Sequence, residues 1–112
     1  MTESMLKVRD WSRIPRRALT PTEIVTRLAD LPGWKLSGDG PDVAIEKGFS
    51  FFDYYETISF VNALAFIANA MDHHPDLWVQ YDRCVVSWRT HTLACITEAD
   101  FEGAARADSL VA

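Results

Sequence analysis

The sequence contains only two cysteines, Cys84 and Cys95, too few for the disulfide framework that supports many small secreted domains. It has no apolar run long enough to span a bilayer, because the longest stretch, residues 61–71, is short and is interrupted by Asn62 and Asn69. The first residues lack both the apolar core and the small-residue cleavage site of a secretory signal. These absences predict a cytoplasmic protein with no membrane span, in which both thiols stay reduced and pack within the core.

Basic residues are also scarce. Eleven Lys and Arg stand against sixteen Asp and Glu, which gives a formal net charge of −5. Sequence-independent binding to nucleic acid needs a concentrated cationic face, and here only Arg9, Arg13, Arg16 and Arg17 cluster. We therefore expect no direct contact with nucleic acid.

The composition is that of one folded domain. Apolar residues make up 48% of the 112-residue chain and charged residues 24%, which are ordinary values for a globular protein. Residues 1–18 show no sustained hydrophobic period and are interpreted as an N-terminal extension. Residues 19–112 are interpreted as a single domain.

Hydrophobic spacing divides this domain into seven elements. Helical spacing or strand alternation predicts helices over residues 19–31, 53–72 and 97–110, and strands over residues 34–36, 43–51, 77–81 and 84–90. The order αββαββα with antiparallel hairpins predicts an α+β fold, in which a four-stranded antiparallel sheet carries helices on one face. The other face would then be wet or would meet another subunit.

Capping residues mark where the helices begin. Thr20 or Thr22 can cap the first helix, and Asp53 can cap the second. Thr97 can cap the third, with Asp100 three residues later as an acidic variant of the capping box. The second helix should end near residue 72, since Pro75 disfavours helical geometry in the residue before it, and the turn between the last two strands is expected at residues 82–83.

The three histidines are the main signal of chemistry, since the chain has no Gly-rich phosphate loop and no serine in a nucleophile-elbow context. His73 and His74 lie at the junction of the second helix and the third strand, and His91 lies at the end of the fourth strand. Converging histidines can donate and accept protons in one turnover, although a lone histidine such as His91 is more often structural.

Three histidines can also hold zinc, but adjacent residues of extended backbone, such as His73 and His74, point to opposite sides. We therefore expect no metal.

Two carboxylates and two tryptophans are candidates for a supporting role. An acid beside a histidine can hold the orientation of its ring; for Asp72 the alternative is a solvated helix end, and for Asp100 a first-turn acid favoured by the helix dipole. Trp78 and Trp88 lie on the same strand pair as the histidines, where they could receive a planar heterocycle, or they could serve as core or interface residues.

Several short motifs, in this order of elements, resemble the pterin-4a-carbinolamine dehydratase family. The resemblance covers roughly residues 19–108. The residues that carry it are Leu19-Thr20, Pro32-Gly33-Trp34, Met71-Asp72-His73-His74-Pro75, Tyr81, Thr90-His91 and Thr97-Glu98-Ala99-Asp100.

The resemblance implies an α+β subunit that forms homodimers or homotetramers and dehydrates 4a-hydroxytetrahydropterin to the quinonoid dihydropterin, within tetrahydrobiopterin recycling. This reaction needs a proton for the departing hydroxyl and loss of a proton from a ring nitrogen, without metal or organic cofactor. The resemblance also supports a non-enzymatic alternative, because some members act as dimerisation cofactors that bind a helix of a transcription factor.

By position, the resemblance also assigns site residues. It implies a catalytic group in which His73 and His91 form the acid/base pair, His74 positions the pterin and Asp100 gives support. The substrate contacts that it implies are Asn69, Asp72, His74 and Thr90.

The chain departs from the family pattern on the turn of helix before the histidines. Asn69 and Ala70 stand where members often carry an acidic residue and a lysine. Asn cannot act as a base, although its amide can bond to the edges of a pterin. If the helix continues to His73, residues 69 and 73 share a face, and Asn69→Glu should then change the dehydration rate or its pH profile.

Overall fold

The computed structural model describes residues 17–111, so residues 1–16 of the expected extension lie outside the described part. Within residues 17–111, three α-helices and four strands follow one another in the predicted order αββαββα. The elements are α1 (Pro21–Ala29), β1 (Lys35–Ser37), β2 (Ala44–Ser50), α2 (Tyr54–Met71), β3 (Asp76–Val79), β4 (Arg83–Trp88) and α3 (Glu98–Ser109), with a short 3-10 helix at Gly40–Asp42 between β1 and β2.

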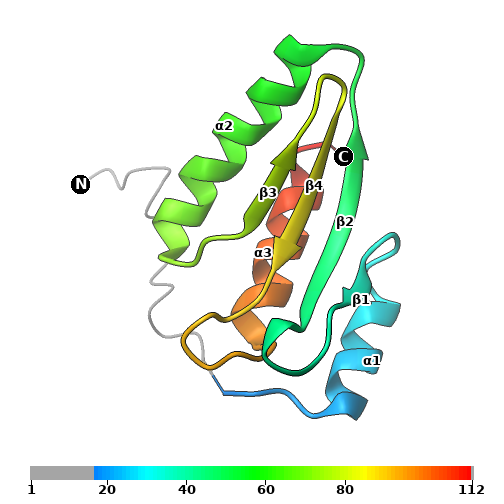
Figure 1. Cartoon of the computed structure of the whole chain (residues 1–112), viewed down its shortest axis with the longest axis vertical. Coiled ribbons are helices and arrows are strands. Elements are labelled where there is room, and N and C mark those ends of the chain that lie inside the picture. The colour runs from blue at the N-terminus through cyan, green and yellow to red at the C-terminus, as the bar shows by residue number, and fades with distance from the viewer. Residues whose placement is uncertain (1–16, 112) are drawn as a thin grey trace, which may run out of the picture.

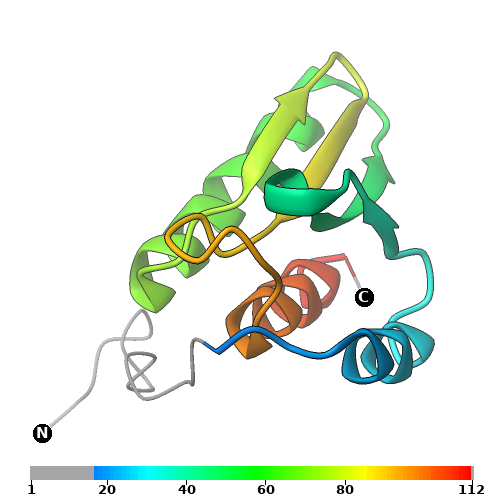
Figure 2. The same ribbon diagram turned by 60° about the horizontal axis from the view of Figure 1, so that its bottom comes forward.

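The four strands form one antiparallel sheet in the order β1-β2-β4-β3 (Figure 1). Both predicted hairpins are present, and the sheet is completed by the long central pairing of β2 with β4, in which Ile45 lies opposite Trp88 and Phe49 opposite Cys84. Figure 2 shows the sheet from its lower end, where β4 leads into α3. The β2–β4 pairing therefore aligns the apolar sides of two segments that are far apart in the sequence.

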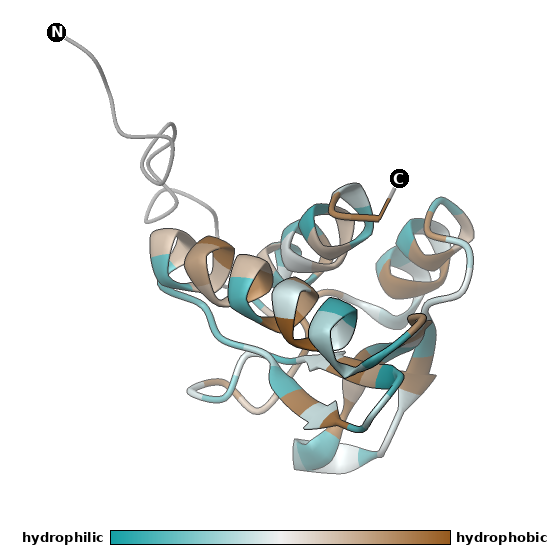
Figure 3. Ribbon diagram, turned by 90° about the horizontal axis from the view of Figure 1, so that it is seen from above, coloured by the Kyte–Doolittle hydropathy of each residue, from teal (hydrophilic) through white to brown (hydrophobic). Residues whose placement is uncertain are grey.

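All three helices lie on one face of the sheet (Figure 3), which confirms the predicted fold class. The buried side chains between the two layers are Ile45, Phe49, Cys84, Val86 and Trp88 from the sheet, Phe60, Leu64, Ala68 and Met71 from α2, and Ala99, Phe101, Ala104 and Ala107 from α3. Removing this apolar surface from water is the main favourable contribution to folding. On the face without helices, Trp78 keeps 54% of its surface exposed.

The predicted helix caps are confirmed, and the structure shows which of the two candidate residues caps α1. Thr20, rather than Thr22, caps α1: its hydroxyl accepts from Glu23 N at 3.2 Å, while the Glu23 carboxylate accepts from Thr20 N at 2.9 Å. Asp53 caps α2 by accepting from Glu56 N at 2.9 Å. Such caps satisfy backbone donors that have no partner within the helix.

The turn between β3 and β4 lies slightly earlier than expected. Gln80 N donates to Arg83 O at 2.8 Å, so Arg83 already pairs with its neighbours as the first residue of β4. The strand β3 ends at Val79, and the expected turn at residues 82–83 is therefore wrong by about one or two residues, because Arg83 is already held in the sheet opposite Ser50 of β2.

Both cysteines are free, Cys84 fully buried in β4 and Cys95 half-buried before α3. Burial raises the pKa of both thiols, and for Cys95 the charge of Asp100 raises it further. Both side chains therefore remain protonated at neutral pH, which agrees with the predicted packing role.

No helix within residues 17–111 has the length and apolar character needed to cross a membrane.

Candidate functional site

The end of α2 determines where the two adjacent histidines go. Asp72 adopts a left-handed conformation with φ 51°, and His73 N then donates to Ala68 O at 3.2 Å, the bonding pattern of a Schellman motif. The chain leaves the helix here and enters an extended segment. His73 is buried and His74 is exposed, as expected for neighbours that point to opposite sides.

His73 is paired with a buried carboxylate. Its Nε2 lies 2.6 Å from Oδ1 of Asp100, which belongs to the first turn of α3. The side chains of His73 and Asp100 are 8% and 0% exposed. Since an ionised carboxylate only accepts hydrogen bonds, Nε2 of His73 carries the proton in this pair, and Nδ1 is the ring nitrogen that remains for proton exchange.

The other oxygen of Asp100 is also fully engaged. Oδ2 accepts from Thr90 Oγ1 at 2.9 Å and from Thr97 N at 2.9 Å. Thr97 Oγ1 lies 2.7 Å from Thr90 Oγ1, and because the single hydroxyl proton of Thr90 goes to Asp100, Thr97 is the donor of this bond. A buried charge needs such partners. Asp100 therefore serves both as a first-turn acid of α3 and as the partner of a histidine, since Oδ2 caps the helix and Oδ1 holds His73.

An aromatic ring also contacts His73. The indole of Trp88 is stacked on the imidazole, with ring centroids 5.7 Å apart and an interplanar angle of 8°. Trp78 lies opposite Val85 of β4, and Val85 and Trp88 are three residues apart on that strand, so the two tryptophans lie on opposite faces of the sheet. Trp88 is fully buried and Trp78 is exposed. Trp88 is the one that reaches the histidine.

Asn69 contacts His74 rather than His73. Asn69 Oδ1 lies 3.0 Å from His74 Nε2, and both side chains are exposed. The expectation that residues 69 and 73 share a helix face is wrong, because the helix ends at Met71 and the left-handed Asp72 redirects the chain. Asp72 itself is an exposed helix-end residue.

His91 lies outside this hydrogen-bonded group. It directly follows the buried Thr90 and is exposed at the start of the connection to α3. Within residues 17–111, its side chain has no hydrogen bond or ion pair to another residue. In the same part of the chain, no three His, Cys, Asp or Glu side chains are grouped closely enough to hold a metal ion.

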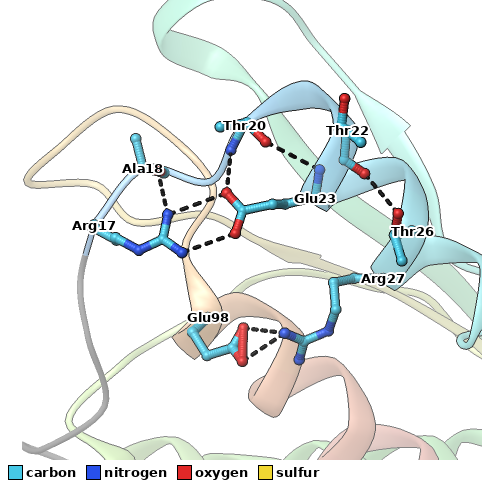
Figure 4. A network of polar contacts seen from close by, with 8 residues as sticks. All are labelled: Arg17, Ala18, Thr20, Thr22, Glu23, Thr26, Arg27 and Glu98. Carbon is cyan, nitrogen blue, oxygen red and sulfur yellow. Dashed lines mark hydrogen bonds and ion pairs between the residues drawn. The ribbon is translucent and has the colours of Figure 1, made fainter.

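A second feature, which the sequence did not indicate, is a hollow of about 360 Å³ between α1 and the start of α3. Its charged lining consists of two ion pairs, Arg17 with Glu23 at 2.8 Å and Arg27 with Glu98 (Figure 4). The hydrogen bond from Arg17 lowers the pKa of Glu23 to about 2. Among the described residues that line the hollow, each cation is matched by an anion and there is no histidine, so the hollow is separate from the group around His73.

Comparison with known proteins places this chain among relatives along nearly its whole length. The family model "Pterin 4 alpha carbinolamine dehydratase" matches residues 17–110. A protein of Paracidovorax citrulli, provisionally named a pterin-4-alpha-carbinolamine dehydratase, is 67% identical over 99% of this chain and 96% of its own. A protein of Bdellovibrio bacteriovorus with the same provisional name is 50% identical over 84% of this chain and 78% of its own.

Two solved structures share the fold. A transcriptional coactivator/pterin dehydratase from Brucella melitensis superimposes with a TM-score of 0.79 at 31% identity, over 86% of this chain and 100% of that one. A pterin dehydratase-like protein described as a RuBisCO assembly factor in the alpha-carboxysome gives 0.59 at 28% identity, over 70% and 88% of the two chains. The fold, the family model and the sequence identity agree, and the chain belongs to the pterin-4a-carbinolamine dehydratase family.

Proposed function

We propose that this protein is a 4a-hydroxytetrahydrobiopterin dehydratase, a hydro-lyase that forms quinonoid dihydropterin in tetrahydrobiopterin recycling. The observation that carries this proposal is the buried His73–Asp100 pair at 2.6 Å, next to an exposed histidine. A histidine whose ring is fixed by a carboxylate is well suited to general acid/base catalysis. Membership of the family supplies the pterin as the substrate class.

The proposed reaction moves two protons and expels water. An acid protonates the 4a-hydroxyl, the C4a–O bond breaks with its electron pair leaving on water, and a base removes a proton from a ring nitrogen, which forms the C=N double bond. We assign these transfers to His73, through Nδ1, and to His91. Asp100 keeps the His73 ring in one tautomer and stabilises its positive charge while it holds the additional proton.

The other exposed residues of the predicted site are assigned to binding of the pterin. His74, bonded to Asn69 at 3.0 Å, is proposed to position the pterin, with Asp72 beside it as a further contact. Thr90 is buried, and we assign it an indirect contribution through Asp100 rather than a direct contact from its hydroxyl. This revises the substrate-contact role that the resemblance implies for it.

We propose a cytoplasmic homodimer or homotetramer that needs no cofactor besides its pterin substrate. Strand β3 lies at one edge of the sheet, and Trp78 and Val79 on it are 54% and 40% exposed. Apolar side chains on an exposed edge strand favour pairing with another chain. This supports assembly through that edge.

The direct test is stopped-flow dehydration of synthetic 4a-hydroxytetrahydropterin. We expect the protein to accelerate water loss above the spontaneous rate, and to do so unchanged after exhaustive dialysis against a chelator, since side chains alone transfer the protons. No acceleration by the folded protein would refute the proposal. Activity restored only by added zinc would refute the metal-free mechanism.

A second candidate function is a protein-binding module. It is favoured by the two solved relatives, of which one is described as a coactivator as well as a dehydratase and the other as an assembly factor. A pure binding module would bind no pterin, and replacing its histidines would leave assembly and partner binding intact. Calorimetry with a dihydropterin analogue separates the two candidates.

Asn69→Ala tests the binding role of the exposed pair. We expect the Kd of a dihydropterin analogue and the KM for carbinolamine to rise several-fold, about 3- to 10-fold, with kcat within about twofold, because the variant releases His74 but not His73. Ser59→Ala, an exposed change earlier on α2, is the control and should alter neither constant. A loss confined to kcat would show that residue 69 acts on proton transfer instead.

A further inference from the structure

Trp88 contacts the backbone of α3 as well as His73. A Cβ atom added at Gly103 would come within 2.6 Å of both Cε2 and Cζ2 of the indole, a separation that requires the ring or the helix to move. Glycine in the interior of a helix is less favourable than alanine. The close approach of the Trp88 ring is the reason that α3 needs glycine at this position.

A second unfavourable feature belongs to the tryptophan itself. Its Nε1 is buried and has no hydrogen-bond partner within residues 17–111, whereas a buried indole N–H usually finds one. Leucine or phenylalanine would fill part of the same space without an unpaired donor. Residues that weaken folding locally tend to occur at functional sites. Here the helical Gly103 and the unpaired Nε1 of Trp88 both involve the same indole ring.

Both the glycine in α3 and the unpaired indole N–H result from the placement of the Trp88 ring, and that ring contacts His73. Asp100 holds one atom of the imidazole, Nε2, and a single hydrogen bond leaves the ring free to turn about that bond. The indole plane, parallel to within 8° at 5.7 Å between centroids, removes this freedom. One bonded atom and one stacked plane together define the direction of Nδ1.

We propose that Trp88 is a positioning residue for His73, held against the imidazole because Gly103 lets its ring lie directly on α3. Its effect on turnover rests on the proposed dehydratase function, since Nδ1 is the atom assigned to proton transfer. Its effect on the orientation of the imidazole does not depend on that function.

The test separates positioning from packing with a compensated pair of substitutions. Trp88→Leu leaves a cavity, and adding Gly103→Leu places new side-chain atoms into the vacated space. We expect the double variant to regain most of the thermal stability that Trp88→Leu loses, while kcat stays about 10-fold below the wild type and KM changes less than about twofold. Trp88→Phe, which keeps an aromatic face, should retain most of kcat. Tyr55→Leu, which alters an 83% exposed aromatic side chain at the start of α2, is the control and should leave kcat unchanged.

A second measurement does not require activity. The Nε2 proton of His73, identified by its loss in His73→Ala, should give a slowly exchanging low-field NMR signal in the wild type and in Trp88→Phe, and should exchange too fast to observe in the double variant. If the wild type is no dehydratase, this difference still supports the positioning role. Wild-type kcat in the double variant, or an unchanged His73 signal there, overturns the proposal. If the double variant does not fold, the single variant Gly103→Ala is used instead, because its Cβ would displace the Trp88 ring. Wild-type kcat or an unchanged His73 signal in that variant overturns the proposal.

Discussion

Replacing His73 with alanine is expected to lower kcat/KM for carbinolamine dehydration by about 10²-fold or more, the usual contribution of a positioned acid or base. The variant removes the ring that Asp100 orients through the 2.6 Å contact. His91→Ala should cause a loss of similar size if the second proton transfer belongs to that exposed residue. Both variants are measured by stopped-flow dehydration of synthetic carbinolamine.

His74→Ala is the matched comparison, because it alters the neighbouring ring. We expect it to weaken binding of a dihydropterin analogue in calorimetry more than His73→Ala does. Circular dichroism at the assay temperature checks that each variant is folded, since His73→Ala leaves the Asp100 carboxylate buried with one partner fewer. Dehydration rates within about twofold of the wild type in both His73→Ala and His91→Ala would contradict the assignment of the acid/base pair.

The second large effect is expected for Asp100→Asn. The amide oxygen can still accept from Thr90 and from Thr97 N, so the cap of α3 is retained. The amide nitrogen, however, would then face His73 as a donor and would force the imidazole into the other tautomer, with the proton on Nδ1. We expect kcat to fall by about 10²-fold or more, as in other histidine–aspartate pairs in which this change reverses the tautomer.

Asp108→Asn is the control for this substitution. Asp108 is also a carboxylate of α3, but its oxygens bind Lys47 at 2.8 Å and Trp34 Nε1 at 3.0 Å instead of a histidine. It should lose stability without a selective loss of kcat. If Asp100→Asn remains folded and keeps wild-type kcat, Asp100 serves only as a cap and does not orient His73.

Much of the local structure follows from residues close together in the sequence. Asp53 begins the long helix and Pro75 limits how far it can extend, Thr20 and Thr97 begin the other two, and alternation identifies the buried side of β4. These signals are effective because caps, turns and side-chain periodicity depend on contacts within a few residues. The opposite environments of His73 and His74 follow in the same way, since adjacent side chains of extended backbone diverge.

The expectation for Asn69 failed for an equally local reason. Its alignment with His73 assumed that the helix continued, whereas the left-handed Asp72 ends it two residues earlier than that alignment requires. Asp tolerates this conformation better than most residues, but the sequence of the turn does not by itself distinguish a helix that stops at residue 71 from one that includes residue 73.

The sequence by itself determined the order of elements, their caps, the apolar faces and the candidate histidines. Only the tertiary structure decided that β2 pairs with β4, that Asp100 rather than Asp72 meets His73, and that Trp88 rather than Trp78 lies against it. These contacts join residues far apart in the chain, and each depends on the register of the sheet and on how α3 packs over it. Register and packing are set by the total apolar surface that the strands and helices bury together, a quantity that no short segment of the sequence contains.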